Sequence, residues 1–204
     1  MSENTSFGLV QAEANYPVGS NNMLRQGASG DQMVSTLHGE LYELAVRGKL
    51  FSVCNQAAVT TTAALATTFT GLAIANPSTS GVNLVIRRFM VSQVAVGAAA
   101  SVGIMVGSGA AAGALTVRNC KVGGAASVTT ASAGATIATP VLERIYGSVG
   151  SLATTGYGLQ NGIDAKVDGG LIIPPGYYAA SYTTIATTTS LIFGFIWEEI
   201  PVLV

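Results

Sequence analysis

The stretch Ser190-Leu-Ile-Phe-Gly-Phe-Ile-Trp-Glu-Glu-Ile200 alternates large apolar residues with small or polar ones, which is the pattern of a β-strand. One face of such a strand carries Leu191, Phe193, Phe195 and Trp197, and the other carries Ser190, Gly194 and Glu198. Because the large side chains share one face, we predict that this face packs into a hydrophobic core.

Strand patterns recur through most of the chain. Residues 83–96 have apolar side chains at odd and even positions, which predicts a strand buried on both sides. Other short strands are predicted at residues 50–53, 101–106, 114–117, 127–130, 137–142, 170–173 and 177–184. Turn residues separate them, above all in 76–81 and 174–176. This pattern predicts an all-β fold, and at this length it favours a jelly-roll-like β-sandwich.

The beginning of the chain has a different character. Residues 1–30 are polar and rich in Asn, Ser and Gly, which predicts an extended arm. Between residues 31 and 47 apolar residues recur at spacings of three and four, and Gly48 follows as a helix C-cap, so we predict a short helix within 40–47. We therefore divide the chain into an N-terminal arm with a short helix, residues 1–47, and a β-sandwich domain, residues 48–204.

Charged residues are scarce. They make up 9% of the 204 residues, against about 25% in an average soluble domain, and the mean hydropathy is +0.50. Residues 50–86 contain no Asp, Glu, Lys or Arg. A surface of Thr, Ser and Ala can meet another subunit without the cost of desolvating ions. We therefore expect much of this surface to contact other protein subunits.

The composition also argues against nucleic acid and membrane as partners. A net charge of −1 offers no excess of positive charge to a phosphate backbone. Residues 89–117 are free of charge as well, but they are mostly Ala, Gly, Ser and Val, with too few Leu and Ile for a transmembrane helix. The first residues lack the basic and apolar regions of a signal peptide, so we expect synthesis in the cytoplasm.

One glycine-rich string resembles a cofactor-binding motif. Gly107, Gly109 and Gly113 follow an apolar run, as in a dinucleotide-binding turn. No acidic residue follows about 20 positions later, where such a site holds the ribose. We interpret residues 106–113 as a loop between strands and predict no cofactor.

Residues that could perform acid–base or metal chemistry are few. Six of the ten acidic residues form three close pairs: Glu40 with Glu43, Asp164 with Asp168, and Glu198 with Glu199. Glu198 and Glu199 are neighbours on a strand and face opposite ways, whereas catalysis needs two carboxylates across one cleft. Asp164 and Asp168 could hold a cation, although a solvated loop is the favoured interpretation. His38 is the only histidine, which leaves no second imidazole for zinc. We predict no catalytic residue, no metal and no enzyme.

The cysteines and aromatic residues are interpreted as structural. Cys54 and Cys120 are far apart and lack metal-ligand spacing, so we expect reduced core residues. The aromatic residues could form a sugar-binding platform, but the spacing around Trp197 favours a core. The set comprises Tyr146, Tyr157, Tyr177, Tyr178, Tyr182, Phe193, Phe195 and Trp197.

Three segments resemble virion proteins of tailed bacteriophages. The first is residues 37–51, Leu-His-Gly-Glu-Leu-Tyr-Glu-Leu-Ala-Val-Arg-Gly-Lys-Leu-Phe. The second is residues 69–77 followed by 81–86, and the third runs from Pro174-Pro175-Gly176 to Trp197-Glu198-Glu199-Ile200-Pro201. The resemblance covers about residues 33–201. It implies a non-enzymatic particle component with a jelly-roll fold, and it carries over no functional residue. Capsid decoration proteins of this kind are commonly homotrimers at symmetry axes of the shell.

The expected function is therefore that of a capsid cement or decoration protein on the outside of a bacteriophage head, a virion component. Its expected partners are two further copies of itself and the major capsid protein, with residues 1–47 reaching neighbouring subunits. The alternative is a receptor- or glycan-binding module of a head fibre or tail, which would use the Tyr-rich loops.

Overall fold

The computed structural model divides the chain into two units, Met1–Glu40 and Leu41–Val204. The structure describes residues 7–9, 21–23, 39–95, 97–109, 113–150, 162–188 and 190–202. In the first unit, β1 (Phe7–Leu9) pairs with β2 (Asn21–Met23) in an antiparallel ladder. The predicted helical pattern of residues 31–38 lies outside the described residues.

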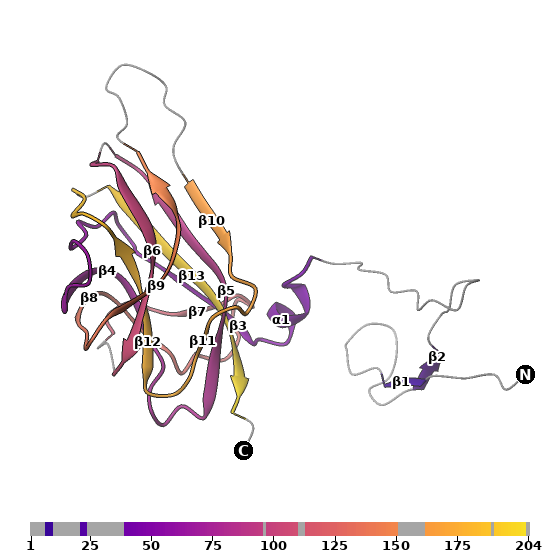
Figure 1. The fold of residues 1–204 in the computed structure, drawn as a ribbon. Helices are drawn as coiled ribbons and strands as arrows, with labels where there is room; N and C mark the ends of the chain where they lie inside the picture. Colours follow the sequence, from indigo (N-terminus) through magenta and orange to yellow (C-terminus); the bar gives the residue numbers. More distant parts are fainter. Residues whose placement is uncertain are drawn as a thin grey trace, which may run out of the picture. The chain divides into compact units, whose positions relative to one another are not determined.

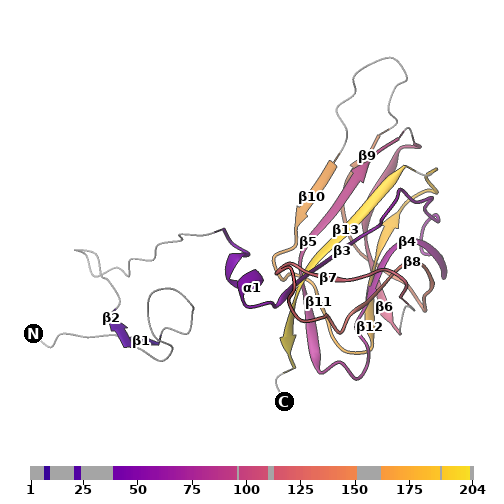
Figure 2. The ribbon, with the colours of Figure 1, turned by 180° about the vertical axis from the view of Figure 1, so that it is seen from behind.

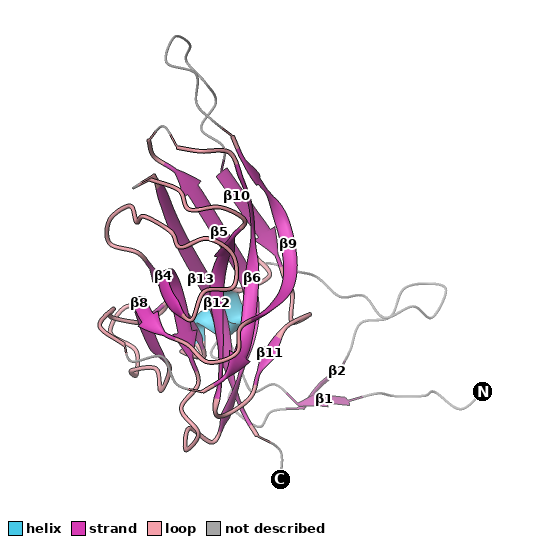
Figure 3. Cartoon of the chain, turned by 60° about the vertical axis from the view of Figure 1, so that its left-hand side comes forward, coloured by secondary structure: helices cyan, strands magenta, loops and turns pink. Residues whose placement is uncertain are grey.

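The second unit consists of two antiparallel sheets (Figure 1), which Figure 2 presents from behind. The strands of the first sheet are β3 (Leu50–Cys54), β5 (Val82–Gln93), β7 (Arg118–Asn119), β10 (Gly162–Lys166), β11 (Ile172–Ile173) and β13 (Leu191–Pro201). Those of the second are β4 (Thr68–Ala75), β6 (Ala100–Ser108), β8 (Thr130–Thr136), β9 (Val141–Val149) and β12 (Tyr177–Thr183). The described residues are almost all in strands and loops (Figure 3), which confirms the all-β sandwich.

Strand pairing is nested along the chain. The first sheet has the order β10-β5-β13-β3-β7, with β11 also on β5, and the second has the order β8-β4-β12-β6-β9. The first and last strands of the second unit, β3 and β13, pair with each other. Moving inward along the sequence, β4 pairs with β12 and β6 pairs with β9. Each strand thus finds a partner that is distant in sequence.

The core lies between the two sheets, and the β13 pattern places β13 at its centre. Leu191, Phe193, Phe195 and Trp197 are completely buried, as predicted. Phe89 of β5 packs on this stripe, with its ring 5.1 Å from that of Phe195. Residues of β4, β6 and β12 complete the same core from the second sheet.

A β-bulge in β5 changes the prediction made for residues 83–96. Ile86 pairs with Trp197 and Arg88 pairs with Ile196, so Arg87 is the extra residue of a bulge. The bulge reverses the alternation, because the even-numbered Leu84 and Ile86 and the odd-numbered Phe89 and Val91 all enter the one core. Apolar residues at even and at odd positions of β5 therefore lie mainly on one face of the strand. β5 ends at Gln93 and not at the predicted residue 96.

Three predicted strands lie elsewhere in the structure. In place of the strand predicted at residues 114–117, the structure has an isolated bridge at Leu115 and the short strand β7. In place of the strand predicted at residues 127–130, it has β8. Residues 137–140 form a connection, so the strand predicted at 137–142 is β9. The alternation of β9 is obscured because its pairing with β6 shifts register twice. β10 was not predicted.

The predicted helix is short. α1 (Tyr42–Val46) is followed by Gly48, which has a φ of 65° and supplies the left-handed residue of a helix C-terminus. The Gly48 N–H donates to Ala45 O at 2.9 Å, and the Lys49 N–H donates to Leu44 O at 3.0 Å. These two bonds are those of a Schellman motif.

The outer face of the second sheet carries a smaller buried cluster around Tyr178. Its other members are Phe69, Ala73, Ala75, Met105, Ile137 and Ala180. The connection 137–140 lies against this cluster, since the Tyr178 hydroxyl donates to Ala138 O at 2.8 Å. Gly107 leaves room for this contact, because a Cβ at Gly107 would lie 2.4 Å from the Tyr178 hydroxyl oxygen.

Candidate functional site

One end of the sandwich is built from connections that contain no charged residue. Cys54 at the end of β3 pairs with Gly194 near the start of β13, and Gln93 at the end of β5 pairs with Leu191. In the second sheet, Thr183 at the end of β12 pairs with Val102 near the start of β6. We call this the charge-free end and define it by the connections 55–67, 94–99 and 184–190.

The sequence of the charge-free end consists of small, hydroxylated and apolar residues. None of its connections contains Asp, Glu, Lys, Arg or His. Residues 96 and 189 lie outside the described residues. The opposite end differs, because Lys49 and Lys121 flank the start of β3 there and the Glu199 N–H bonds to Lys49 O. These exposed lysines therefore lie at the opposite end, where the connections 76–81 and 174–176 lack charge as well.

Threonine hydroxyls hold two connections of the charge-free end together. Thr61 and Thr187 are buried, and their hydroxyl oxygens lie 3.0 Å apart. The Thr183 hydroxyl donates to the Thr61 hydroxyl at 2.8 Å, and the Thr187 N–H donates to the same oxygen at 3.0 Å. The connections 55–67 and 184–190 are thus fixed by bonds that need no ionic group.

Asn55 ties the same end to both sheets. Its side-chain nitrogen donates to Gly71 O of β4 at 2.8 Å, and its side-chain oxygen accepts from the Phe193 N–H of β13 at 3.1 Å. Asn55 is only 3% exposed, so both bonds lie in the interior, where leaving either group unpaired would be costly. The end is therefore a fixed surface over its described connections.

Apolar side chains project from three of these connections. Leu65 is 43% exposed, Val94 is 47% exposed and Ile185 is 43% exposed. The same connections carry exposed alanines, namely Ala63, Ala64, Ala95, Ala98 and Ala186. A surface of methyl and hydroxyl groups suits contact with another protein, because burying it costs no ion desolvation.

Three of the acidic residues considered in the sequence, Asp164, Glu198 and Glu199, each have a structural partner. Asp164 lies on β10 rather than in a loop, and its carboxylate accepts from Arg88 at 2.8 Å. Glu198 accepts from Arg87 at 2.5 Å. Glu199 accepts from the hydroxyls of Ser127 and Thr129, the latter at 3.0 Å.

The described residues bring together no group of three or more His, Cys, Asp and Glu side chains that could hold a metal ion. Asp168 follows β10 in a turn, with a φ of 46°. Glu43 pairs with Arg47 at 3.6 Å along α1. Glu40 is described, whereas His38 lies outside the described residues.

The glycine-rich string does not form a dinucleotide-binding turn in its described part. Gly107 belongs to β6, where it contacts Tyr178, and Gly109 follows with a φ of 117°. Residues 113–117 are not helical, so the helix start that would face a pyrophosphate is missing there. Residues 110–112 lie outside the described residues.

The aromatic residues are mostly core residues rather than a platform. Phe193, Phe195, Trp197 and Tyr178 are completely buried, and the ring of Tyr146 lies 5.5 Å from that of Phe89. Burial raises the pKa of Tyr146; the charge of Arg144 opposes this rise, and that of Glu143 adds to it. Of the remaining tyrosines, Tyr177 is exposed, Tyr182 is half-buried and Tyr157 lies outside the described residues.

The prediction that the cysteines are core residues was wrong. Cys54 and Cys120 are both free and exposed. Cys54 is the last residue of β3, where Phe51 and Val53 take the inward positions and leave Cys54 on the outer face. Cys120 follows β7 at the sheet edge, with its N–H bonded to Leu50 O.

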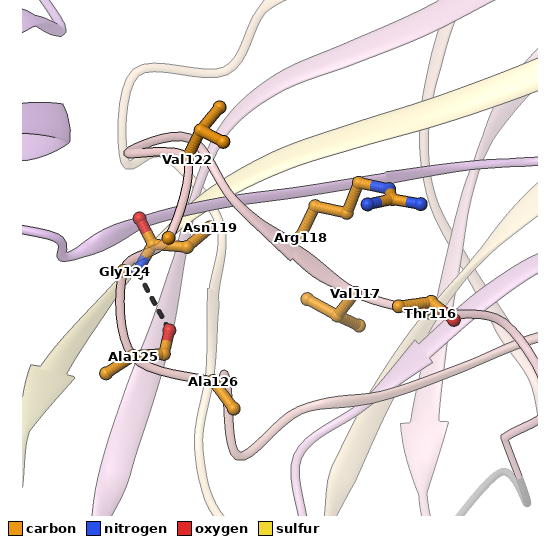
Figure 4. A pocket seen from close by; sticks show the side chains of 9 residues that line it. Thr116, Val117, Arg118, Asn119, Val122, Gly124, Ala125 and Ala126 are labelled. Carbon is orange, nitrogen blue, oxygen red and sulfur yellow. Dashed lines mark hydrogen bonds between the residues drawn. The ribbon is translucent and has the colours of Figure 1, made fainter.

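Two hollows lie away from the charge-free end. One, of about 300 Å³, is lined by residues 116–119 and 122–126 around the Asn119 side chain, which donates to Ala125 O at 3.0 Å (Figure 4). Val122 projects from its turn and is 98% exposed. The other, of about 270 Å³, is largely apolar and is lined by Asn83, Val85, Ile172, Ile200, Pro201 and Val202. Neither hollow gathers groups suited to catalysis.

Sequence reasoning found the charge-free segment 50–86 but missed the residues that shape the end. Thr61, Thr183 and Thr187 are ordinary members of Thr-rich stretches, and only the strand pairing brings them together. Among the described residues no helix is long and apolar enough to cross a membrane. Comparisons with protein-family models, with curated proteins and with solved structures found no match.

Proposed function

We propose that this protein is a non-enzymatic structural component of a bacteriophage particle, a capsid decoration or cement protein. It acts as a homotrimer that binds the major capsid protein on the outer surface of the head. The observation that carries the proposal is the charge-free end, a fixed surface of methyl and hydroxyl groups suited to permanent contact with protein.

The strand order supports the jelly-roll version of the sandwich. Strands β3, β13, β5 and β10 are neighbours in one sheet, and β4, β12, β6 and β9 are neighbours in the other. The chain passes between the sheets from β3 to β4 to β5 to β6, and it returns through β9, β10, β12 and β13 as their partners. Such a rolled hairpin contains the two Greek keys of a jelly roll, with β7 and β8 as an insertion.

The mechanism of a cement protein is adhesion. Apolar area removed from water contributes about 25 cal/mol per Å², and a symmetric shell repeats the contact at many equivalent places. Several linked contacts bind far more tightly than one, so a trimer with three arms is held even when each arm binds weakly. In this proposal residues 1–47 supply the contact with neighbouring capsid subunits.

The test uses heads assembled without the protein. Purified full-length protein is expected to decorate them, and a variant without residues 1–30 is expected to lose binding while it keeps the trimer mass. Sedimentation with heads measures binding, and light scattering measures mass. A truncated protein that still decorates heads would show that the arm is not the attachment segment.

Copy number separates this proposal from the alternative of a receptor- or glycan-binding module. A cement protein is present in many copies spread over the head, whereas a tail or fibre module is present in few copies at one place. Labelling of particles with an antibody distinguishes the two. Binding to a glycan array, without binding to heads, would favour the alternative.

A further inference from the structure

We infer that the charge-free end is the surface through which copies of this chain meet at the axis of the homotrimer. This inference rests on the proposed function, which makes the protein a trimer. It adds to that proposal by assigning the end to self-association, and it leaves the shell to other surfaces.

The distribution of charge carries the inference. In a cyclic oligomer the residues nearest the axis face their own copies, so any charged residue there meets a like charge. Like charges that face each other across an interface are unfavourable. A surface at a rotation axis is therefore selected to lack charge, and the three connections of the charge-free end lack it entirely.

The opposite end of the sandwich does not meet this requirement. Lys49 and Lys121 are exposed there, and Arg118 is exposed on the adjoining β7. Gathered around an axis, these side chains would repeat one positive patch in every copy. They suit a partner of different sequence, such as an acidic surface, better than a second copy of this chain.

The charge-free end also has the apolar groups and the rigidity that a lasting interface needs. Leu65, Val94 and Ile185, each 43–47% exposed, come from three different connections. The hydroxyl bonds among Thr61, Thr183 and Thr187 fix two of these connections before association. Little conformational entropy is then lost when the surfaces meet.

The decisive experiment introduces a charge at this end. Ile185→Lys and Leu65→Lys place like charges around the axis, so we expect the concentration at which the trimer dissociates to rise at least about tenfold at low salt. High salt should restore part of the affinity, because it screens the repulsion. Analytical ultracentrifugation across a dilution series measures both effects.

Two control variants separate charge from misfolding. Ile185→Thr keeps the end uncharged and should stay close to the wild type, and Val122→Lys adds the same charge to a side chain that is 98% exposed elsewhere. Circular dichroism verifies that every variant is folded. If the Lys variants are folded and remain trimers at wild-type concentrations, the inference is overturned while the proposed function stands. A wild-type monomer would overturn both.

The two native cysteines give an independent measurement. Both are exposed, Cys54 beside the charge-free end and Cys120 near the opposite end. A short bismaleimide can join two chains that each carry one cysteine. We expect more cross-linked dimer from Cys120→Ser, which retains Cys54, than from Cys54→Ser. The reverse order of yields would overturn the inference.

Discussion

At the scale of single residues, Tyr178 links packing to pH. Its ring is buried in the outer cluster of the second sheet, and its hydroxyl donates to Ala138 O at 2.8 Å. Burial raises the pKa of Tyr178 above its ordinary value of 10.0. The unfolded chain therefore releases the phenolic proton first as the pH rises. The resulting stability is complete below about pH 10 and is lost as the pH rises through the folded-state pKa.

We expect the free energy of unfolding to fall as the pH rises above about 10, and to fall less in Tyr178→Phe. At neutral pH this variant should be about 1 kcal/mol less stable, because it lacks the hydrogen bond to Ala138. Tyr146 also has a raised pKa, so part of the alkaline loss remains. Urea titrations at several pH values measure both effects, with the exposed Tyr177→Phe as control. An unchanged alkaline slope in Tyr178→Phe contradicts this account.

Thr61 is the second residue whose removal is informative. Its hydroxyl accepts from the Thr187 N–H and the Thr183 hydroxyl, and all three threonines are buried. Thr61→Val keeps the shape but leaves the buried Thr187 N–H unpaired and the Thr183 hydroxyl with only its longer bond to Thr62 O, so we expect a loss of about 1–3 kcal/mol in unfolding free energy. The matched variant at the exposed Thr68 should change stability by less than about 0.5 kcal/mol. Urea unfolding compares them, and equal stabilities would mean that the hydroxyl network does not hold the end.

At the scale of elements, the bulge at Arg87 sets the register of β5. It lets Leu84 and Ile86 share the core with Phe89 and Val91. Because Ile86 and Arg88 already pair with Trp197 and Ile196, deleting Arg87 would close the bulge and leave all four side chains on the core face in unbroken alternation.

We therefore expect the variant without Arg87 to fold with the same strand pairing. It should lose about 1–3 kcal/mol of unfolding free energy, as Arg87→Ala does, because both variants lack the contact to Glu198. Circular dichroism verifies the fold, and urea unfolding compares the two variants with the wild type. A deletion variant that is unfolded while Arg87→Ala folds would show that β5 needs the bulge itself.

The same bulge shows how far local pattern reaches in this sequence. β13 was predicted in position, face and burial because its alternation is unbroken through Trp197. β5 was predicted in position, but its faces were not, because apolar residues at odd and even positions arise equally from burial on both sides and from a bulge that reverses the alternation. β9 was misplaced, since its two register shifts and its charged pair Glu143 and Arg144 disturb the alternation. β10 was missed because Asp164 and Lys166 occupy its outward positions.

For the candidate site, the sequence predicts the absence of charged residues but not which segments lie together. The absence of charge between residues 50 and 86 is plain in the sequence, and so is that of the later connections 94–99 and 184–190. That these segments meet at one end depends on pairings such as Gln93 with Leu191, which are distant in sequence. Cys54 was misjudged for the same reason, because only the register of β3 decides which side chains face outward.

At the scale of the whole molecule, the two ends of the sandwich differ in the charge of their exposed side chains. One end presents methyl and hydroxyl groups, and the other presents the exposed Lys49, Arg118 and Lys121. A trimer with the first end at its axis would keep the charged ends apart, where they can stay hydrated or meet a charged shell. This arrangement also explains how a chain with 9% charged residues avoids exposing its apolar loops.

If copies associate in this way, stability depends on protein concentration. Mass action favours the trimer at high concentration, so we expect the melting temperature of the wild type to rise as the protein is concentrated. Trp197 is the single tryptophan, completely buried, with Phe51 stacked 6.3 Å away, so its fluorescence reports the opening of the core. Ile185→Lys should lower the melting temperature and weaken its dependence on concentration, whereas Val122→Lys should keep the wild-type dependence. A wild-type melting temperature that is the same at every concentration would contradict a trimer whose assembly is coupled to folding.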